Sequence, residues 1–293
     1  MIVITAPTGN IGSRVLSRLF DAGEDLRVIV RDPARLPEPV RERVEVVAGS
    51  HGDPEVVDRA FAGADAVFWV VPPDSSRAPA DGWSGFTGPA AKALVAHQVG
   101  HVVGVSALGR GTAVADQAGL VTASLAMDEL IAGTGVAYRA LANPSFFENL
   151  LEEVDSIREK GVYADVLDPD RKAPLVAVAD IAAVAARLLR DRSWTGFADV
   201  PVLGPEDLSP HDVARIMSEQ LGRPVRYERE SLDDLRTTLI GYGLNEDFVH
   251  GIAEMKHAKD NGLDAGIART AGTASETTFE QWCAETLKPA FDA

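Results

Sequence analysis

Cysteine is nearly absent from this chain, because Cys283 is the only one among 293 residues. A single thiol excludes an internal disulfide and a thiolate metal cluster, and Cys283 is expected to pack beside Trp282. No apolar run reaches the roughly 20 residues that a membrane-spanning helix needs. The segment Met1–Thr5 is too short for a secretory signal and lacks a basic leader, so a cytoplasmic location is expected.

Basic residues are also scarce, with 28 Lys and Arg against 44 Asp and Glu, which gives a formal net charge of −16. The resulting field repels nucleic acids and anionic membrane surfaces, so neither is expected as a partner. The six histidines show no His-x-x-x-His spacing, so no metal site is predicted. A small-molecule substrate is the expected partner, and any anionic ligand needs a local site of backbone N–H groups and a few basic side chains.

Short apolar runs alternate with amphipathic segments over the first 140 residues. The runs of strand length lie at 2–5, 26–30, 44–47, 66–71, 102–106 and 136–141, and the helical segments at 11–22, 54–62, 85–98 and 120–132. Nearly continuous apolar strands separated by helices are typical of a parallel sheet that is covered on both faces. The pattern predicts an α/β fold, a doubly wound parallel sheet of Rossmann-like type, over residues 1–150.

The pattern changes over residues 151–293, which predict a smaller α/β C-terminal substrate-side domain, with residues at about 175–200 returning to the main sheet. Residues 162–175 are expected to be a loop, and Asp180 is expected to cap a helix at 180–190. Strands are predicted at 198–203 and 225–230 and a loop at 261–273. Further helices are predicted at 210–221, 231–242, 246–259 and 276–287.

A glycine-containing turn, Thr8-Gly9-Asn10-Ile11-Gly12, joins the first predicted strand to the first helix. Gly9 permits a pyrophosphate to approach the backbone, and Gly12 permits the helix to pack close to the sheet. The helix then directs its free N–H groups at the anion. Ala6 replaces the usual first glycine, so the tight turn must form in a restricted conformation. The side chains of Thr8 and Asn10 either donate to phosphate or only fix the turn.

The end of the second strand carries a basic residue, Arg31, about 20 positions after Gly12. NAD-binding proteins often place a carboxylate there for the ribose 2′-hydroxyl, whereas a guanidinium pairs with a 2′-phosphate. Asp32-Pro33 is better explained as a helix start, with Asp at the cap and Pro at the first helical position. NADP(H) is therefore the predicted cofactor, in preference to NAD(H).

The turn at residues 8–12 and the segment at 30–33, together with later segments in the same order, resemble the NmrA-like branch of the atypical short-chain dehydrogenases/reductases. The other matching blocks are Gly52-Asp53 and residues 63–68, 105–109, 143–149, 178–182 and 203–206. The resemblance implies that Asp53 lies near the adenine of the cofactor. It further implies a nicotinamide side formed by Val71, Pro72, Ser106 and Asn143, and a substrate pocket formed by Pro73, Leu108, Phe146 and Phe147.

The proton donor of short-chain reductases is missing here. By similarity their Tyr-x-x-x-Lys pair falls on Leu120 and Ser124, and neither side chain can replace it. Three interpretations remain: a reductase of a quinone, enone, imine or carbonyl, whose proton comes from Ser106, another hydroxyl or water; a redox sensor that binds NADP(H) and acts through a homodimer or protein partner; and a biosynthetic protein with a non-redox role. An S-adenosylmethionine-binding protein is a more distant alternative.

Overall fold

A seven-stranded parallel sheet forms the centre of the protein, of which a computed structural model describes all 293 residues. The strand order is β10-β6-β5-β4-β1-β2-β3, so the direction of winding reverses between β1 and β4. The strands are β1 (Ile2–Thr5), β2 (Leu26–Val30), β3 (Glu45–Ala48), β4 (Ala66–Trp69), β5 (His101–Ala107), β6 (Ala137–Asn143) and β10 (Phe197–Pro201). This is the predicted doubly wound topology, whose ligands bind beyond the carboxyl ends of the strands at the reversal.

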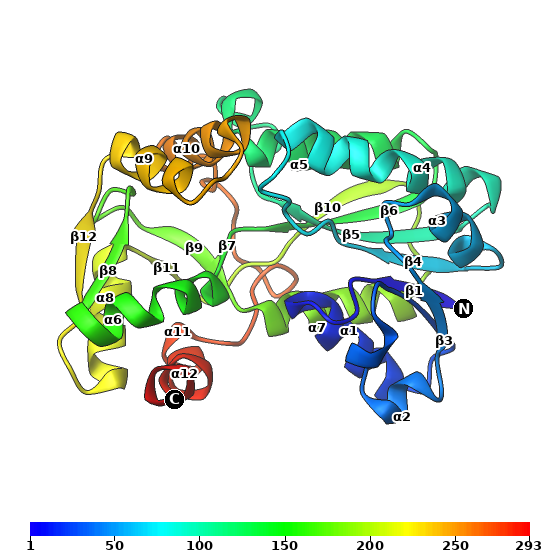
Figure 1. Ribbon diagram of the computed structural model, residues 1–293, viewed down its shortest axis with the longest axis horizontal. Helices are drawn as coiled ribbons and strands as arrows, with labels where there is room; N and C mark the ends of the chain where they lie inside the picture. Colours follow the sequence, from blue (N-terminus) through cyan, green and yellow to red (C-terminus); the bar gives the residue numbers. More distant parts are fainter.

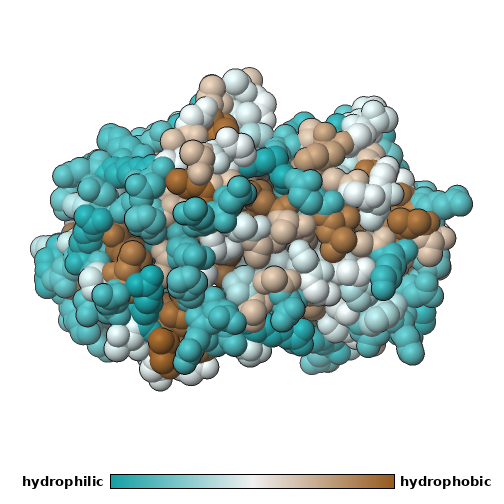
Figure 2. All heavy atoms as spheres, turned by 90° about the horizontal axis from the view of Figure 1, so that it is seen from above, coloured by the Kyte–Doolittle hydropathy of each residue, from teal (hydrophilic) through white to brown (hydrophobic).

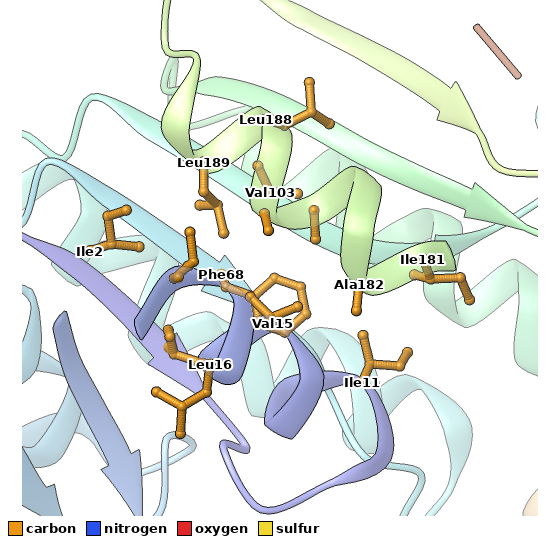
Figure 3. Packing of buried hydrophobic residues seen from close by; sticks show 14 of the residues in the cluster. Ile2, Ile11, Val15, Leu16, Phe68, Val103, Ile181, Ala182, Leu188 and Leu189 are labelled. Atoms are coloured by element: carbon orange, nitrogen blue, oxygen red, sulfur yellow. The ribbon is translucent and has the colours of Figure 1, made fainter. Parts of the chain in front are cut away.

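Helices cover both faces of this sheet (Figure 1). One face carries α1 (Asn10–Asp21) and α7 (Val178–Arg190), and the other carries α3 (Pro54–Phe61), α4 (Phe86–Ala96) and α5 (Leu120–Ala132). Alanines at the buried positions of α7 allow it to lie close to α1, and side chains of both helices meet residues of the strands in one apolar core (Figure 3). Short elements complete this part: η1 (Pro33–Arg35), α2 (Glu38–Arg41), η2 (Asp81–Gly85) and η3 (Ala115–Gln117).

The remaining elements form a smaller lobe beside the carboxyl ends of the strands. In Figure 1 the N-terminus lies on the far side of the sheet, and β1 runs from there toward this lobe. The lobe contains a sheet of β11 (Asp207–Leu208), β9 (Ala173–Val176) and β7 (Ser145–Phe146), and a pair of β12 (Arg226–Arg229) and β8 (Val162–Asp165). Its helical elements are η4 (Phe147–Glu153), α6 (Val154–Lys160), α8 (Pro210–Leu221), α9 (Leu232–Gly241), α11 (Phe279–Trp282), η5 (Cys283–Leu287) and α12 (Lys288–Asp292).

One long helix, α10 (Glu246–Asp260), joins the two parts. It packs on α5 of the main sheet, and its Phe248 lies in the core beneath α3, α4 and α5. The expected closing helix at 276–287 is divided, because η5 interrupts it with a π-helical turn. Cys283 is fully buried in that turn and packs with Trp282, as expected.

Two predictions about the second half were wrong. Residues 162–175 contain β8 and most of β9 in place of a continuous loop. Both strands are only four residues long and pair with segments distant in the sequence. The sequence therefore indicated only a short extended segment at 175–178, which overlaps the end of β9, and not β8. Asp180 does not cap its helix: α7 begins two residues earlier, where the buried Glu148 carboxylate accepts a hydrogen bond from the Val178 N–H (3.0 Å).

Asp180 instead binds the C-terminal segment, since its carboxylate accepts hydrogen bonds from the backbone N–H and the hydroxyl of Thr277.

None of the helices combines the length and the apolar character needed to cross a lipid bilayer. Seen from the side of α10, α5 and α4, the surface is largely hydrophilic or neutral, and its hydrophobic atoms form separate patches (Figure 2).

Candidate active site

The turn between β1 and α1 has the geometry that a bound pyrophosphate requires. Ala6 adopts a left-handed conformation (φ 46°), and its carbonyl accepts a hydrogen bond from the Gly9 N–H (3.0 Å). A Cβ atom on Gly12 would lie 2.1 Å from the Ala6 carbonyl oxygen, which leaves no room for a side chain. Ala6 thus takes the tight-turn position of the missing glycine, and Gly12 permits the close packing of helix against strand.

The N-terminus of α1 is open toward the carboxyl edge of the sheet. No side chain caps it, no acidic residue lies in its first turn, and Gly9 and Asn10 are exposed. Thr5 fixes the neighbouring strand ends, because its hydroxyl donates to the Phe68 carbonyl and accepts from the Val70 N–H, both at 3.0 Å. Free N–H groups at the point where the winding reverses are suited to an anionic diphosphate.

Arg31 lies exposed immediately after β2, on the side of the site where the predicted adenosine half belongs. Asp32 accepts a hydrogen bond from the Ala34 N–H (3.0 Å) and caps η1, with Pro33 at the first position, as predicted. Asp53, expected near the adenine, uses Oδ1 to cap α3, where it accepts from two backbone N–H groups. Its role toward the base therefore stays a prediction.

His51 was not identified in the sequence, and the structure places it after β3, beside the strand β2 that Arg31 follows. Its ring is 8% exposed and lies edge-on to the rings of Trp69 and Phe86. Burial lowers the pKa of His51 to about 4, and the positive charge of Arg31 contributes to this shift. His51 is therefore a neutral imidazole at physiological pH.

On the other side of the reversal, Ser106 is the last residue but one of β5, and Asn143 ends the neighbouring strand β6. The Asn143 amide donates to the backbone carbonyls of Ser106 (3.1 Å) and Leu141 (2.8 Å). Its Oδ1 is buried without a hydrogen-bond partner. A buried, unpaired carbonyl is unfavourable, so a donor from a bound molecule would satisfy it. Val71 is buried after β4, and Pro72 and Pro73 are exposed.

The Ser106 hydroxyl belongs to a buried polar network that the sequence did not reveal. It donates to Oδ2 of Asp128 on α5 (2.5 Å), and Tyr138 donates to Oδ1 (2.5 Å). Arg110 donates to the same carboxylate (3.0 Å) and also pairs with Asp199 and Glu129. The only signal in the sequence was a carboxylate on an otherwise apolar helix face, four positions after Ser124.

Burial has the largest effect on the Asp128 carboxyl and raises its pKa to about 6, although its three donors oppose this shift. Burial and the neighbouring Asp128 also raise the pKa of the Tyr138 phenol well above its usual range. Since the single proton of Ser106 is directed at Asp128, Ser106 presents lone pairs, not a proton, to other neighbours while Asp128 is ionised.

The residues expected in the substrate pocket divide into two groups. Leu108 is buried against Ala142 and Leu203, and Phe147 packs on Trp282 in the core of the smaller lobe. Phe146 remains partly exposed and Pro73 exposed. This agrees with the expectation that one of the adjacent phenylalanines is a core residue. One surface hollow lies elsewhere, between the smaller lobe and the end of α10, and is lined only by polar residues: Asp168, Asp170, Arg171, Arg229, His257, Asp260 and Asn261.

The substitution Gly12→Ala should lower the free energy of unfolding by about 1–3 kcal/mol, because the new Cβ displaces the Ala6 carbonyl. Gly9→Ala is the matched control, since its Cβ would lie 3.4 Å from the same oxygen, an ordinary contact. Urea unfolding of both variants measures the difference. Equal losses in the two variants would contradict the close approach.

The two buried titratable groups should affect acid stability in opposite directions. The pKa of His51 is about 4 in the folded protein and 6.5 in the unfolded chain. Between these two pH values the unfolded chain binds more protons, so the stability of the folded protein falls as the pH is lowered from 6.5 to 4. The pKa of Asp128 is about 6 in the folded protein and 3.8 in the unfolded chain. Between these two pH values the folded protein binds more protons, so the contribution of Asp128 to stability rises as the pH is lowered from 6 to 3.8. Each contribution amounts to about 3 kcal/mol, and the two offset each other in the wild type.

Removal of either group should expose the other's contribution. As the pH is lowered from 6.5 to 4, the free energy of unfolding of His51→Phe should rise relative to that of the wild type, by up to about 3 kcal/mol. The free energy of unfolding of Asp128→Asn should fall relative to that of the wild type by a similar amount. Urea unfolding at several pH values tests both signs. The same pH dependence in all three proteins would show that neither group is held as the structure indicates.

Comparison with known proteins agrees with this geometry. The family described as NAD(P)H-binding matches residues 7–192. The chain is 34% identical to a (4-alkanoyl-5-oxo-2,5-dihydrofuran-3-yl)methyl phosphate reductase of Streptomyces griseus, over 82% of this chain and 80% of the relative. It is 30% identical to an NAD(P)H azoreductase of Xenophilus azovorans, over 92% and 91% of the two chains. These relatives confirm the prediction of an oxidoreductase.

Solved structures share the fold. The NADPH-dependent quinone oxidoreductase QOR2 of Escherichia coli has a TM-score of 0.79 at 23% identity, over 98% of this chain and all of that one. A mutant of NmrA has a TM-score of 0.70 at 15% identity, over 97% and 94% of the two chains, which agrees with the predicted NmrA-like resemblance. With its dinucleotide turn, its sheet order and these matches, the chain belongs to the NAD(P)H-binding family.

Proposed function

We propose that this protein is an NADPH-dependent reductase of small conjugated acceptors such as quinones, enones, imines and azo compounds. The observation that carries this proposal is the absence of a free proton donor. By the family resemblance, Leu120 and Ser124 on α5 fall where short-chain reductases carry their Tyr and Lys. The proton of Ser106 is directed at Asp128.

The chemistry of the acceptor decides how much a proton donor matters. Reduction of an isolated ketone places negative charge on a single oxygen, which a positioned acid must neutralise. In a conjugated acceptor the charge spreads over several atoms and reaches an oxygen or nitrogen that water can protonate. A site without Tyr and Lys is therefore better suited to conjugated acceptors than to simple carbonyl compounds.

The names of the relatives support the same class of substrate. They describe reduction of an azo compound, of a quinone and of a 2,5-dihydrofuran ring, which keeps a carbon–carbon double bond beside its carbonyl groups. All three are conjugated acceptors. The relative at 25% identity, quinone oxidoreductase 2 of Escherichia coli, matches over 91% of this chain.

Most of the predicted residues have a role in this proposal. The open N-terminus of α1, with Thr8, Gly9, Asn10, Ile11 and Gly12, holds the pyrophosphate, and Arg31 holds the 2′-phosphate. Asn143 Oδ1, which is buried and unpaired, accepts a hydrogen bond from the nicotinamide amide. NADPH, when bound, supplies the hydride. Val71, Pro72 and Ser106 border the nicotinamide, and Pro73 and Phe146 contact the acceptor.

A panel of acceptors tests the reaction. Purified protein should oxidise NADPH, followed at 340 nm, with quinones, enones, imines or azo dyes, and at least about 100-fold more slowly with unconjugated ketones, for lack of a positioned acid. Comparable rates with simple ketones would contradict the argument from the missing donor. Saturable NADPH binding without turnover of any acceptor would instead support the redox-sensor alternative.

Substitution of Arg31 tests the choice of cofactor. Arg31→Ala should weaken NADPH binding by about 10- to 100-fold and leave NADH binding nearly unchanged, because only NADPH carries the 2′-phosphate. Arg41→Ala, an exposed arginine on α2, is the matched control. Fluorescence titration with both nucleotides measures the dissociation constants, and equal losses for the two would disprove the phosphate contact.

A further inference from the structure

His51 lies beyond the end of β3, on the same side of the β1–β4 reversal as Arg31. This is the side that the adenosine half of a dinucleotide takes when its pyrophosphate lies at the N-terminus of α1. Arg31 directly follows β2, and His51 follows β3, the strand that pairs with it, so both residues lie at the same edge of the sheet. If Arg31 holds the 2′-phosphate, the adjoining base lies within reach of His51. The inference therefore rests on the proposed cofactor.

The imidazole ring is held in one orientation. Its Nε2 is 2.9 Å from the backbone carbonyl of Val70, and the rings of Trp69 and Phe86 pack against it at centroid distances of 5.2 and 4.8 Å. The loop packs closely on Phe86 at Gly52, where a Cβ would lie 2.4 Å from the ring. A ring restrained on several sides is preorganised for a directional contact.

The contact with Val70 also determines the tautomer. A carbonyl oxygen only accepts, so Nε2 carries the proton and Nδ1 of the neutral ring carries a lone pair. Burial keeps the ring neutral, since it lowers the pKa to about 4. No protein group donates to Nδ1, whereas Nε2 has its partner. The ring therefore offers one acceptor that the protein leaves unused.

Asp53, the residue first expected near the base, is less suited to this task. Its carboxylate is exposed, and its Oδ1 accepts hydrogen bonds from Glu55 and Val56 at the start of α3. An exposed acceptor in contact with water discriminates weakly between bases, whereas His51 as a whole is only 8% exposed, so water competes less for its acceptor.

We propose that Nδ1 of His51 accepts a hydrogen bond from the 6-amino group of the adenine in NADPH and makes the protein selective for this base. Adenine presents a donor at that position. Hypoxanthine presents a carbonyl oxygen there, which would face the lone pair of Nδ1 and cannot bond to it. His51 is thus a specificity-determining residue for the cofactor and takes no part in the chemical step.

A comparison of two nucleotides tests this role. Wild-type protein should bind NADPH at least about tenfold more tightly than reduced nicotinamide hypoxanthine dinucleotide phosphate, as expected when one buried hydrogen bond is lost. His51→Phe keeps an aromatic ring against Trp69 and Phe86 but has no acceptor, so its dissociation constants for the two nucleotides should become equal. A purely structural His51 would weaken both nucleotides by the same factor. Fluorescence titration supplies the four values.

His97→Phe is the control, because His97 pairs with Asp58 on the outer surface of α3 and α4 and should retain the wild-type preference. Equal wild-type affinity for the two nucleotides, or a preference that persists in His51→Phe, would overturn this inference and leave the proposed function intact. Failure of the wild type to bind either nucleotide would overturn both. If His51→Phe does not fold, the two wild-type constants alone still decide whether the base is read.

Discussion

The close approach of α1 to the end of β1 is the constraint on which the rest of the site depends. It requires a left-handed turn at Ala6 and no side chain at Gly12, since the Ala6 carbonyl occupies the space that a Cβ would need. The packing brings the helix N-terminus to the point where the sheet reverses. Thr5 then fixes the end of β1 to β4. The pyrophosphate position and both halves of the crevice follow from this one arrangement.

Two buried polar groups flank that arrangement in different ways. On the side of β5 and β6, Asp128 accepts hydrogen bonds from a strand, a loop and a neighbouring strand, so it connects α5 to the sheet beneath it. On the side of β2 and β3, His51 is held mainly by aromatic rings and one backbone carbonyl. A paired buried carboxylate restrains the surrounding elements strongly, because removal of one partner leaves a charge that the interior cannot solvate.

Elements and site residues could be predicted from the sequence where they depend on residues that are neighbours in the chain. The helices at 120–132 and 210–221 were predicted with their observed bounds, because the apolar spacing and the flanking turn residues are strong there. The start of α7 was misplaced, because its N–H partner, Glu148, comes from 30 positions earlier in the chain. His51 gave no sequence signal, since its burial depends on Trp69 and Phe86, which are brought to it only by the fold. The turn at residues 8–12 was predictable because strand, turn and helix are consecutive.

The position of α10 has a consequence for how the protein is made. Its Phe248 belongs to the core beneath α3, α4 and α5, and β10 forms the edge of the same sheet. The first strands of the sheet emerge from the ribosome well before α10, so that core stays incomplete until Phe248 has been synthesised. The nascent chain must keep an apolar surface exposed for most of its synthesis.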